Sequence, residues 1–468
     1  MSTETLTRSD VDAAAVDSAA AGNNRIWQGR LTFIMAAAGS AVGLGNLWKF
    51  PYIAGENGGG AFVLVYLACI LCFGIPLLMA EIGIGRVTRS NALGAFHKLT
   101  EQSGANPRWN LVGGLAILTS YLILSFYIVV AGWCLYYFWI TASGSFSGSE
   151  QVVDKALTGG TFGGLLASPM TLIIASVTFL LITFGIVSSG VKRGIEKSVN
   201  WMMPSLMLIL ALLIGYSIRN GNFAAAVDFL FDADFSKLTL DGVLIAVGHS
   251  FFTLSLASGA IITYGAYMPA SSSIPKTAFA VATIDTLVAL TAGLAIFPLV
   301  FEYGLEPGAG PGLMFISLPL IFGNMPYGEL FGTVFFFMLF IAALTSAISL
   351  MEPTVAWLEQ RFNMPRVKAA SLTTASLWLV SLGTVFSLNI WDSPIFFGKT
   401  FFDALDYVTA NVFMTLGGLA TALFCGFCLK PQQLEQMFGE GSAVITPFRF
   451  AMRYVVPVFV LVLAVASL

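Results

Sequence analysis

The chain has 468 residues, of which 57% are hydrophobic and 10% are charged, whereas a soluble domain carries about 25% charged residues. This composition excludes a soluble globular protein and indicates an all-α integral membrane protein, with membrane lipid around it. The formal net charge of −3 gives no indication of a nucleic-acid partner, and we expect none.

The predicted elements begin with a polar stretch, residues 1–24, which we expect to be a disordered cytoplasmic tail. It is not a signal peptide, because no basic segment precedes an apolar core. A spanning helix needs about 20 apolar residues, and about eleven segments qualify. These are residues 32–56, 60–85, 111–140, 169–190, 195–218, 240–268, 276–302, 329–358, 368–387, 401–429 and 447–467.

The basic residues between these spans favour one orientation. Only Lys155, Arg219, Lys237 and Lys399 fall in the segments that alternate to one side, and every other Lys or Arg except Lys49 falls on the opposite side. Because cytoplasmic loops are enriched in Lys and Arg, we expect a multi-pass protein of the inner (plasma) membrane. Its N-terminus would be cytoplasmic, and an odd number of spans places its C-terminus outside.

Two of the spans contain interruptions. Residues 38–46 and residues 253–259 replace bulky apolar side chains with Gly, Ser and Ala in the middle of a predicted span. Unwound backbone is tolerated in a bilayer only where protein or a cavity satisfies its polar groups. Paired interruptions in the two halves of a chain indicate the binding site of a transporter.

Polar side chains are rare within the spans, and each is a functional candidate because it is expensive there. They are Ser40, Asn46, Lys49, His249, Ser250, Thr253, Ser255, Ser258, Asp285, Thr345, Ser346, Ser349, Glu352, Asp403 and Asp406. Their oxygens, with unwound carbonyls, form a hard site suited to an alkali cation, and unwound amides suit a carboxylate.

Some of these residues also have ordinary structural interpretations. Thr345, Ser346 and Ser349 could donate to carbonyls one turn earlier in their helix, as Ser and Thr often do. Glu352 precedes a proline and could mark a helix kink. Tyr127 could be an interfacial tyrosine.

No catalytic constellation is found in the sequence. HExxH, GxSxG and P-loop motifs are absent, and two histidines cannot form a multi-histidine metal site. The five cysteines lie in apolar runs, where thiols are usually inert. We therefore predict no enzyme activity and no organic cofactor.

Several motifs resemble the neurotransmitter:sodium symporter family, in its bacterial amino-acid branch. The most specific is GSAVGLGNLWKFPY from Gly39 to Tyr52, followed by ENGGGAF at 56–62, FFTLSL at 251–256, LTS at 344–346 and DALD at 403–406. The resemblance implies a LeuT-type 5+5 inverted repeat with discontinuous helices 1 and 6. Residues 25–218 would form the first repeat, residues 240–429 the second, and residues 447–467 the eleventh span.

The resemblance also implies two co-transported sodium ions. The first site would use Ala41, Asn46, Thr253 and Asp285, and the second Gly39, Val42, Ala342, Thr345 and Ser346.

A substrate site is implied between the two ions. Its residues would be Ser40, Ala41, Gly43, Leu44, Gly45, Ile123, Tyr127, Phe252, Thr253, Ser255, Ala257, Ser258, Ser346, Ser349 and Leu350. Gly43 stands where monoamine carriers have an Asp, which favours a substrate carboxylate beside Gly43, Gly45 and Tyr127. Because Ser258 is small, we expect medium or large neutral side chains, aromatic ones included.

The gates and the anion dependence follow from the same resemblance. Lys49 and Asp406 would form the outer gate, and Trp27, Arg25 and Glu359 the inner one. Asp285 stands where Asn or Ser is common, so its fixed charge should make chloride unnecessary. The inner gate departs from the family pattern, which places its Arg at Asn24 and its Asp at Gln360.

The sequence therefore predicts a sodium-coupled symporter of neutral amino acids that works by alternating access, as a monomer or a homodimer. A symporter of taurine or of a β- or γ-amino acid is the alternative within the class. A channel or a substrate-sensing membrane receptor is the alternative from another class. A channel needs a continuous polar lining, whereas the polar groups here cluster at mid-depth.

Overall fold

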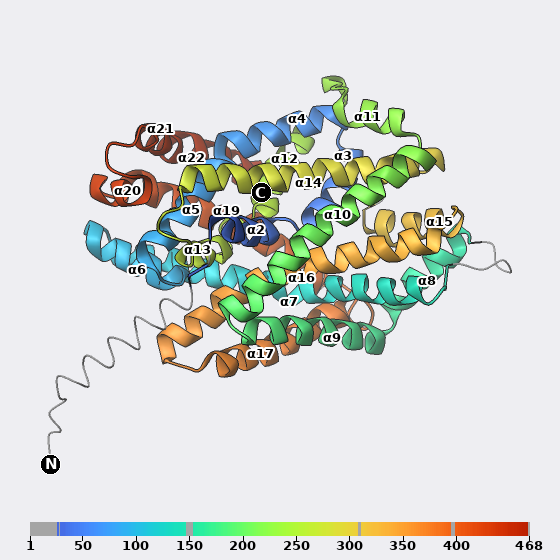
Figure 1. Cartoon of the computed structure of the whole chain (residues 1–468), viewed down its shortest axis with the longest axis horizontal. Helices are drawn as coiled ribbons and strands as arrows, with labels where there is room; N and C mark the ends of the chain where they lie inside the picture. Colours follow the sequence, from blue (N-terminus) through green and yellow to red (C-terminus); the bar gives the residue numbers. More distant parts are fainter. Residues whose placement is uncertain (1–25, 28, 147–152, 308–309, 395–397, 467–468) are drawn as a thin grey trace, which may run out of the picture.

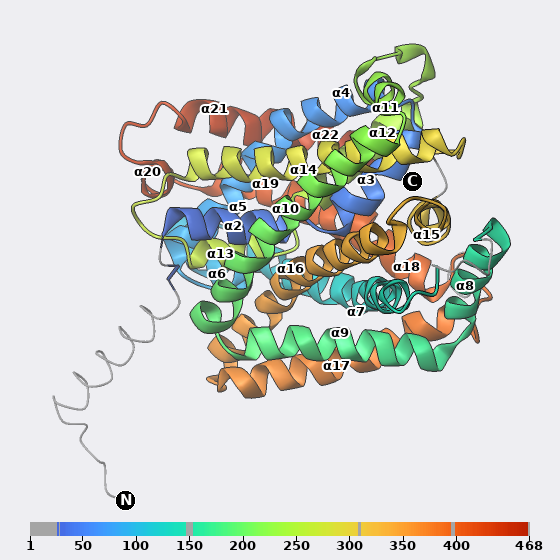
Figure 2. The same ribbon diagram turned by 45° about the vertical axis from the view of Figure 1, so that its right-hand side comes forward.

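The computed structural model describes residues 26–27, 29–146, 153–307, 310–394 and 398–466, and their regular elements are helices that form one bundle (Figures 1 and 2). The predicted tail at residues 1–24 and the inner-gate candidate Arg25 lie outside the described residues. The all-α membrane fold predicted from composition is confirmed.

Within the described residues, nine helical segments are long and apolar enough to cross a membrane. They are Gly60–Thr88, Pro107–Ala142, Pro169–Ser188, Val191–Asn220, Ile274–Glu302, Gly328–Phe362, Arg366–Ser387, Phe401–Cys428 and Ile445–Val462. A tenth span is a broken pair, Arg30–Ala41 and Gly45–Glu56, bent by 53°. Each of the ten overlaps one of the predicted segments.

The remaining predicted span, residues 240–268, consists of two short helices. α12 (Leu240–Thr253) and α13 (Ala260–Ala266) are separated by residues 254–259, which are not helical. The chain thus breaks at both places where Gly, Ser and Ala interrupt the apolar pattern. Neither helix alone is long enough to span, so the described residues give ten spans by length instead of the predicted eleven.

The second break has a strained backbone. Ser255 and Ala257 have φ values of 54° and 58°, a region that non-glycine residues rarely adopt and that costs about 1–3 kcal/mol each. Glu81 of α5 (Ile75–Thr88) is fully buried beside it, and its Oε1 accepts a hydrogen bond of 2.6 Å from the Ala257 N–H. The buried Glu81 carboxyl therefore stabilises the strained turn by accepting this hydrogen bond.

The two longest helices, α7 (Asn110–Ala142) and α16 (Gly328–Phe362), run side by side through the bundle (Figure 2). The helices that pack against one or both of them include α2 (Arg30–Ala41), α9 (Pro169–Ser188), α10 (Lys197–Asn220), α17 (Arg366–Ser387), α18 (Phe401–Tyr407) and α19 (Met414–Leu423). The rest of the bundle includes α3 (Phe50–Glu56), α4 (Gly60–Cys69), α14 (Ile274–Glu302) and α22 (Val456–Ala466). Both breaks face this pair, since Ser346 Oγ of α16 lies 3.5 Å from the Val42 carbonyl in the first break and Ser120 Oγ of α7 donates to the Ser258 carbonyl in the second.

Shorter helices cover the two ends of the bundle (Figure 1). At one end lie α6 (Ala92–Ser103), α20 (Pro431–Phe438) and α21 (Ile445–Phe450). At the other lie α8 (Lys155–Ala167), α11 (Phe223–Phe231) and α15 (Leu318–Gly323).

Candidate functional site

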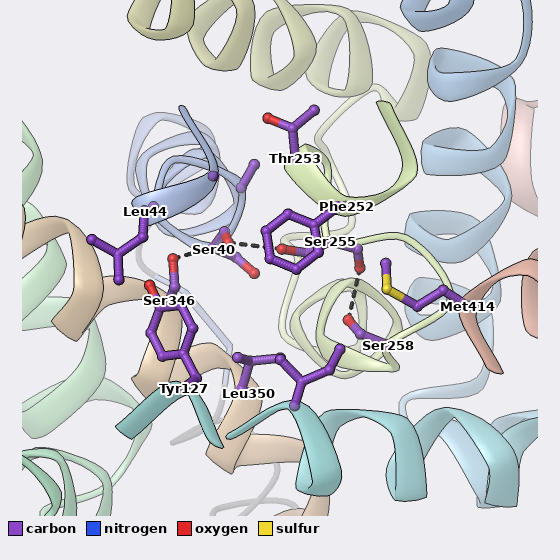
Figure 3. A pocket seen from close by; sticks show the side chains of 14 residues that line it. Ser40, Leu44, Tyr127, Phe252, Thr253, Ser255, Ser258, Ser346, Leu350 and Met414 are labelled. Carbon is purple, nitrogen blue, oxygen red and sulfur yellow. Dashed lines mark hydrogen bonds between the residues drawn. The ribbon is translucent and has the colours of Figure 1, made fainter. Parts of the chain in front are cut away.

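A small cavity of about 30 Å³ lies between the two helix breaks. It is lined by Ser40, Ala41, Gly43, Leu44, Gly45, Ile123, Tyr127, Phe252, Thr253, Ser255, Ser258, Ser346, Leu350 and Met414 (Figure 3). All the residues predicted to bind substrate are in this lining except Ala257 and Ser349. Met414 lines the cavity without having been predicted.

The two exceptions have clear places in the fold. Ser349 is fully buried and donates a 2.8 Å hydrogen bond to the Ser346 carbonyl, which is the ordinary back-bonding of a helical serine. Ala257 is buried against α19, where a Cβ built on Gly417 would lie 3.1 Å from the Ala257 Cβ.

Two hydroxyl groups in the cavity lining have no hydrogen-bond partner among the described residues, that of Tyr127 at one end and that of Ser40 near the middle (Figure 3). Both hydroxyls are buried. A Cβ built on Gly43 would collide with Ser346 Oγ and lie 3.4 Å from the Tyr127 hydroxyl. Only glycine at position 43 leaves this space open, and an unsatisfied buried hydroxyl costs about 1–3 kcal/mol unless something binds it.

The serines at the opposite end are hydrogen-bonded to backbone carbonyls. Ser255 Oγ donates to the Ser40 carbonyl at 2.8 Å, which links the two helix breaks directly. Ser258 Oγ donates to the Ser255 carbonyl at 2.7 Å, and Ser120 Oγ of α7 donates to the Ser258 carbonyl. These hydroxyl protons hold the breaks together and do not point freely into the cavity.

Asn46, Thr253 and Asp285 come together beside the first break, and each is almost fully buried. Thr253 Oγ1 lies 3.1 and 3.0 Å from the two Asp285 carboxylate oxygens. Asn46 Nδ2 lies 2.7 Å from Asp285 Oδ1, while its Oδ1 accepts from the Gly43 N–H at 3.0 Å. The amide orientation follows from this hydrogen-bond network.

A second group of oxygens lies where α2 ends against α16. Thr345 Oγ1 is 2.9 Å from the Ala342 carbonyl and 3.4 Å from the Val42 carbonyl. Ser346 Oγ is 3.5 Å from the Val42 carbonyl. A Cβ built on Gly39 would lie 3.5 Å from Thr345 Cβ, so all five residues predicted for this group are adjacent.

His249 has an unusual setting near the first group. Its ring is buried between Phe50 and Tyr66, with centroid distances of 5.9 and 5.6 Å, and neither ring nitrogen has a hydrogen-bond partner among the described residues. The Tyr66 hydroxyl lies 3.5 Å from Asp285 Oδ2.

On one side the cavity is separated by a single layer of side chains from a larger space of about 180 Å³. Tyr127 and Phe252 line both spaces. Lys49 and Asp406 line only the larger one, and they form no ion pair within 4 Å. Instead, Lys49 Nζ lies 4.8 Å from the centroid of the Phe252 ring.

The opposite side is closed by a buried network. The backbone N–H of Trp27 donates to the Tyr267 carbonyl at 3.0 Å, and the Tyr267 hydroxyl donates to Glu352 Oε1 at 2.7 Å. Arg366 Nη1 lies 3.0 Å from Glu352 and 3.2 Å from Glu359. Glu352 is therefore the centre of an ion-pair network, a role that its alternative interpretation as the site of a helix kink does not include.

Sequence reasoning missed Met414, Tyr267 and Arg366. Arg366 had been counted only among the basic loop residues, and a signal existed, since a buried glutamate in a span needs a cationic partner. Met414 gave no signal, because a methionine in an apolar span is unremarkable.

A model of the sodium:neurotransmitter symporter family matches residues 24–149 and 164–468. The chain belongs to this family. The predicted resemblance is confirmed, and the protein is a membrane transporter of a sodium-dependent family, not an enzyme.

Similar proteins cover almost the whole chain. It is 37% identical over 440 residues to YhdH of Bacillus subtilis, an uncharacterized sodium-dependent transporter, covering 93% of this chain and 96% of the relative. A Haemophilus influenzae protein of the same description is 34% identical over 449 residues, covering 94% and 98%. The crystal structure of MhsT in complex with L-phenylalanine has 39% identity and a TM-score of 0.86, covering 95% and 99%.

Proposed function

We propose that this family member is a sodium-coupled symporter that imports medium or large neutral α-amino acids, aromatic ones included, by alternating access. The observation that carries the proposal is the cavity between the two helix breaks, whose lining includes the buried Tyr127 and Ser40 hydroxyls, neither of which has a hydrogen-bond partner among the described residues. The binding of L-phenylalanine by the similar transporter MhsT supports the choice of substrate class.

The substrate carboxylate would occupy the end of the cavity beside Gly43 and Gly45. There the Tyr127 hydroxyl would donate a hydrogen bond to it, and a side chain at position 43 would fill the space. Amide groups left free by the break would donate as well, because the end of a helix presents unpaired N–H groups to an anion.

The first sodium ion would be held by Asn46, Thr253, Asp285 and the Ala41 carbonyl. In the present orientation the Asn46 Nδ2 faces Asp285. Rotation of the amide would turn Oδ1 toward the ion and release the Gly43 N–H, to which it is now bonded. The same motion would free a donor for the substrate carboxylate, which would couple sodium binding to substrate binding.

The second sodium ion would be held by the Thr345 and Ser346 hydroxyls with the carbonyls of Gly39, Val42 and Ala342. These groups belong to α2, to the first break and to α16. An ion between them would fasten α2 to α16 and stabilise closure of the side on which α2 lies.

Chloride would not be required. Asp285 supplies a fixed carboxylate beside the first ion, and the nearby residue Ala289 is buried and offers no polar ligand.

Alternating access would require the two sides of the cavity to open in turn, and the two sides are closed by different sets of residues. Lys49, Asp406, Tyr127 and Phe252 would form the outer gate, and Trp27 with the network around Glu359 the inner one. We assign the inner side to the cytoplasm of the plasma membrane, because the end of the bundle with α6 and α20 holds the basic loops (Figure 1).

A thermal-shift screen of the purified protein against the standard amino acids, with sodium or with potassium, tests the proposal. We expect stabilisation by large neutral amino acids only when sodium is present, since a ligand stabilises the state to which it binds. Stabilisation by lysine or glutamate above all others would contradict it, because a buried charge has no counterion in the cavity.

A further inference from the structure

The end of the cavity farthest from Tyr127 is bounded by Met414. This residue begins α19, is 2% exposed, and places its side chain beside Ser255 and Ser258 (Figure 3). α19 belongs to neither broken helix, so this wall comes from a separate part of the chain.

Met414 reaches the cavity because α19 packs unusually close to the second break. A Cβ built on Gly417 would lie 3.1 Å from the Ala257 Cβ, and one built on Gly418 would lie 2.6 Å from the Phe251 ring. Residues three and four apart share a helix face. The two glycines therefore bring the face that carries Met414 against residues 254–259.

The surroundings of Met414 are less polar than the sequence suggests. Ser255 and Ser258 both line this end, but each hydroxyl proton is already bonded to a backbone carbonyl. The two serine oxygens can still accept hydrogen bonds, but their protons are not free to donate. The carbonyl oxygen of a substrate amide placed here would therefore lose its water without gaining a serine donor.

The cavity is also too small for a large side chain unless a wall moves. Its volume of about 30 Å³ is only two to three times the space of about 10–15 Å³ that one water molecule needs. The β-branched Ile123 in the interior of α7 is stiff, whereas methionine has three rotatable bonds and adapts to irregular space. Met414 is the wall at the distal end that can move at least cost.

We infer that Met414 is a specificity-determining residue, the adjustable end wall that lets the site accept large apolar and aromatic side chains and reject polar side chains of equal size. This inference rests on the proposed function. Its thioether would contact an aromatic ring, a favourable pairing, and its rotation would set the largest substrate that fits.

The test is an affinity series on the full-length purified protein in sodium, with alanine, leucine, phenylalanine and tryptophan, and the matched pair methionine and glutamine. The unmutated protein should bind methionine about tenfold or more tighter than glutamine. Met414→Phe should lower the affinity for phenylalanine and tryptophan about tenfold or more, and it should change the affinity for alanine by less than about threefold. Such ratios correspond to the discrimination that pocket contacts provide.

Met414→Ala should act in the opposite direction and favour tryptophan relative to leucine. Met437→Ala is the matched control, because Met437 is equally buried but packs against Gly83 in another part of the bundle. It should leave the size ranking unchanged. Met414→Leu keeps the side-chain volume at this position and can be used if the other substitutions prevent folding. It should narrow the range of substrate side-chain sizes that bind.

An unchanged size ranking in the Met414 variants, with amino acids still bound in sodium, overturns this inference alone. Equal affinity for methionine and glutamine also overturns it. Failure of every amino acid to bind the unmutated protein overturns the proposed function together with it.

Discussion

The two sides of the cavity are closed in different ways. Toward the proposed outside, Tyr127 and Phe252 form one layer beneath an open space, and the charges of Lys49 and Asp406 are not paired. Toward the proposed cytoplasm, the closure is a buried network centred on Glu352.

The difference implies unequal costs of opening. Opening the outer side separates no Lys49–Asp406 ion pair, and even an exposed pair contributes only about 0–1 kcal/mol, whereas removing one partner of a buried pair costs about 3–5 kcal/mol. The outer side should therefore open by rotation of a few side chains, and the inner side only when a buried network separates. We therefore expect the carrier to face outward before substrate binds and to depend on bound ions to control the inner side.

The largest expected effect is at the inner closure. Arg366→Ala leaves Glu352 as a buried carboxylate without its cation, so the closed inner state should lose about 3–5 kcal/mol. Hydrogen exchange of α13 and the start of α2, measured without sodium, should rise by two orders of magnitude or more. Arg361→Ala, an exposed arginine in the last turn of α16, is the control and should change exchange little. Wild-type exchange in Arg366→Ala would refute the unequal-closure account.

The next effect concerns the ions that would control that closure. Asp285→Asn removes the fixed charge beside Thr253 and Asn46, so sodium affinity should fall by about 10- to 100-fold, the value of a charge-assisted contact of about 1.5–3 kcal/mol. Transport by the variant should gain a dependence on chloride. Sodium titration of substrate binding, in chloride and in gluconate, measures both. Strict chloride dependence of the unmutated protein would exclude this role for Asp285.

A smaller effect is expected inside the cavity between the two closures. Ser258→Phe fills the distal end beside Met414, so the preference should move toward smaller amino acids, with phenylalanine binding weakened about tenfold. Ser250→Ala is a suitable control, since Ser250 is buried on α12 and bonds only the Val247 carbonyl among the described residues. The cavity assignment fails if Ser258→Phe binds phenylalanine and alanine in the original ratio.

The smallest effect is predicted for the outer gate. The double substitution of Lys49 and Asp406 by alanine should change the transport rate two- to fivefold and the substrate affinity by less than about twofold, because the two side chains are only half-buried and do not pair with each other. Rates from uptake and affinities from binding separate the two quantities. Identical kinetics would remove Lys49 and Asp406 from the gate.

The sequence predicted best those features that depend on neighbouring residues of the chain, such as interruptions of a helix. The Gly, Ser and Ala runs predicted both helix breaks. The polar residues in the spans were only single candidates, and their grouping around Asp285 and Thr345 was implied by the family resemblance. The sequence did not predict contacts made between distant helices. Met414 enters the cavity because Gly417 and Gly418 let α19 approach a strained turn. The glycine pair indicates a close helix contact, but it does not say which element α19 approaches.

The hydroxyl groups were the other limit. From the sequence, a serine in a span is equally consistent with a ligand or with a side chain that donates to a carbonyl of its own helix. Only the folded structure distinguishes the two roles. Ser349 proved to be back-bonded, whereas Ser40 is buried without a partner in the described structure. The Glu352–Arg366 pair joins two consecutive helices, and charge pattern alone does not say that they pack together at this depth.

The most direct test of the central claim is uptake of labelled L-phenylalanine into proteoliposomes under an imposed inward sodium gradient. The account predicts accumulation above the external concentration, loss of accumulation when potassium replaces sodium, and no loss when gluconate replaces chloride. Equilibration without accumulation, or uptake indifferent to sodium, would contradict a sodium-coupled symporter.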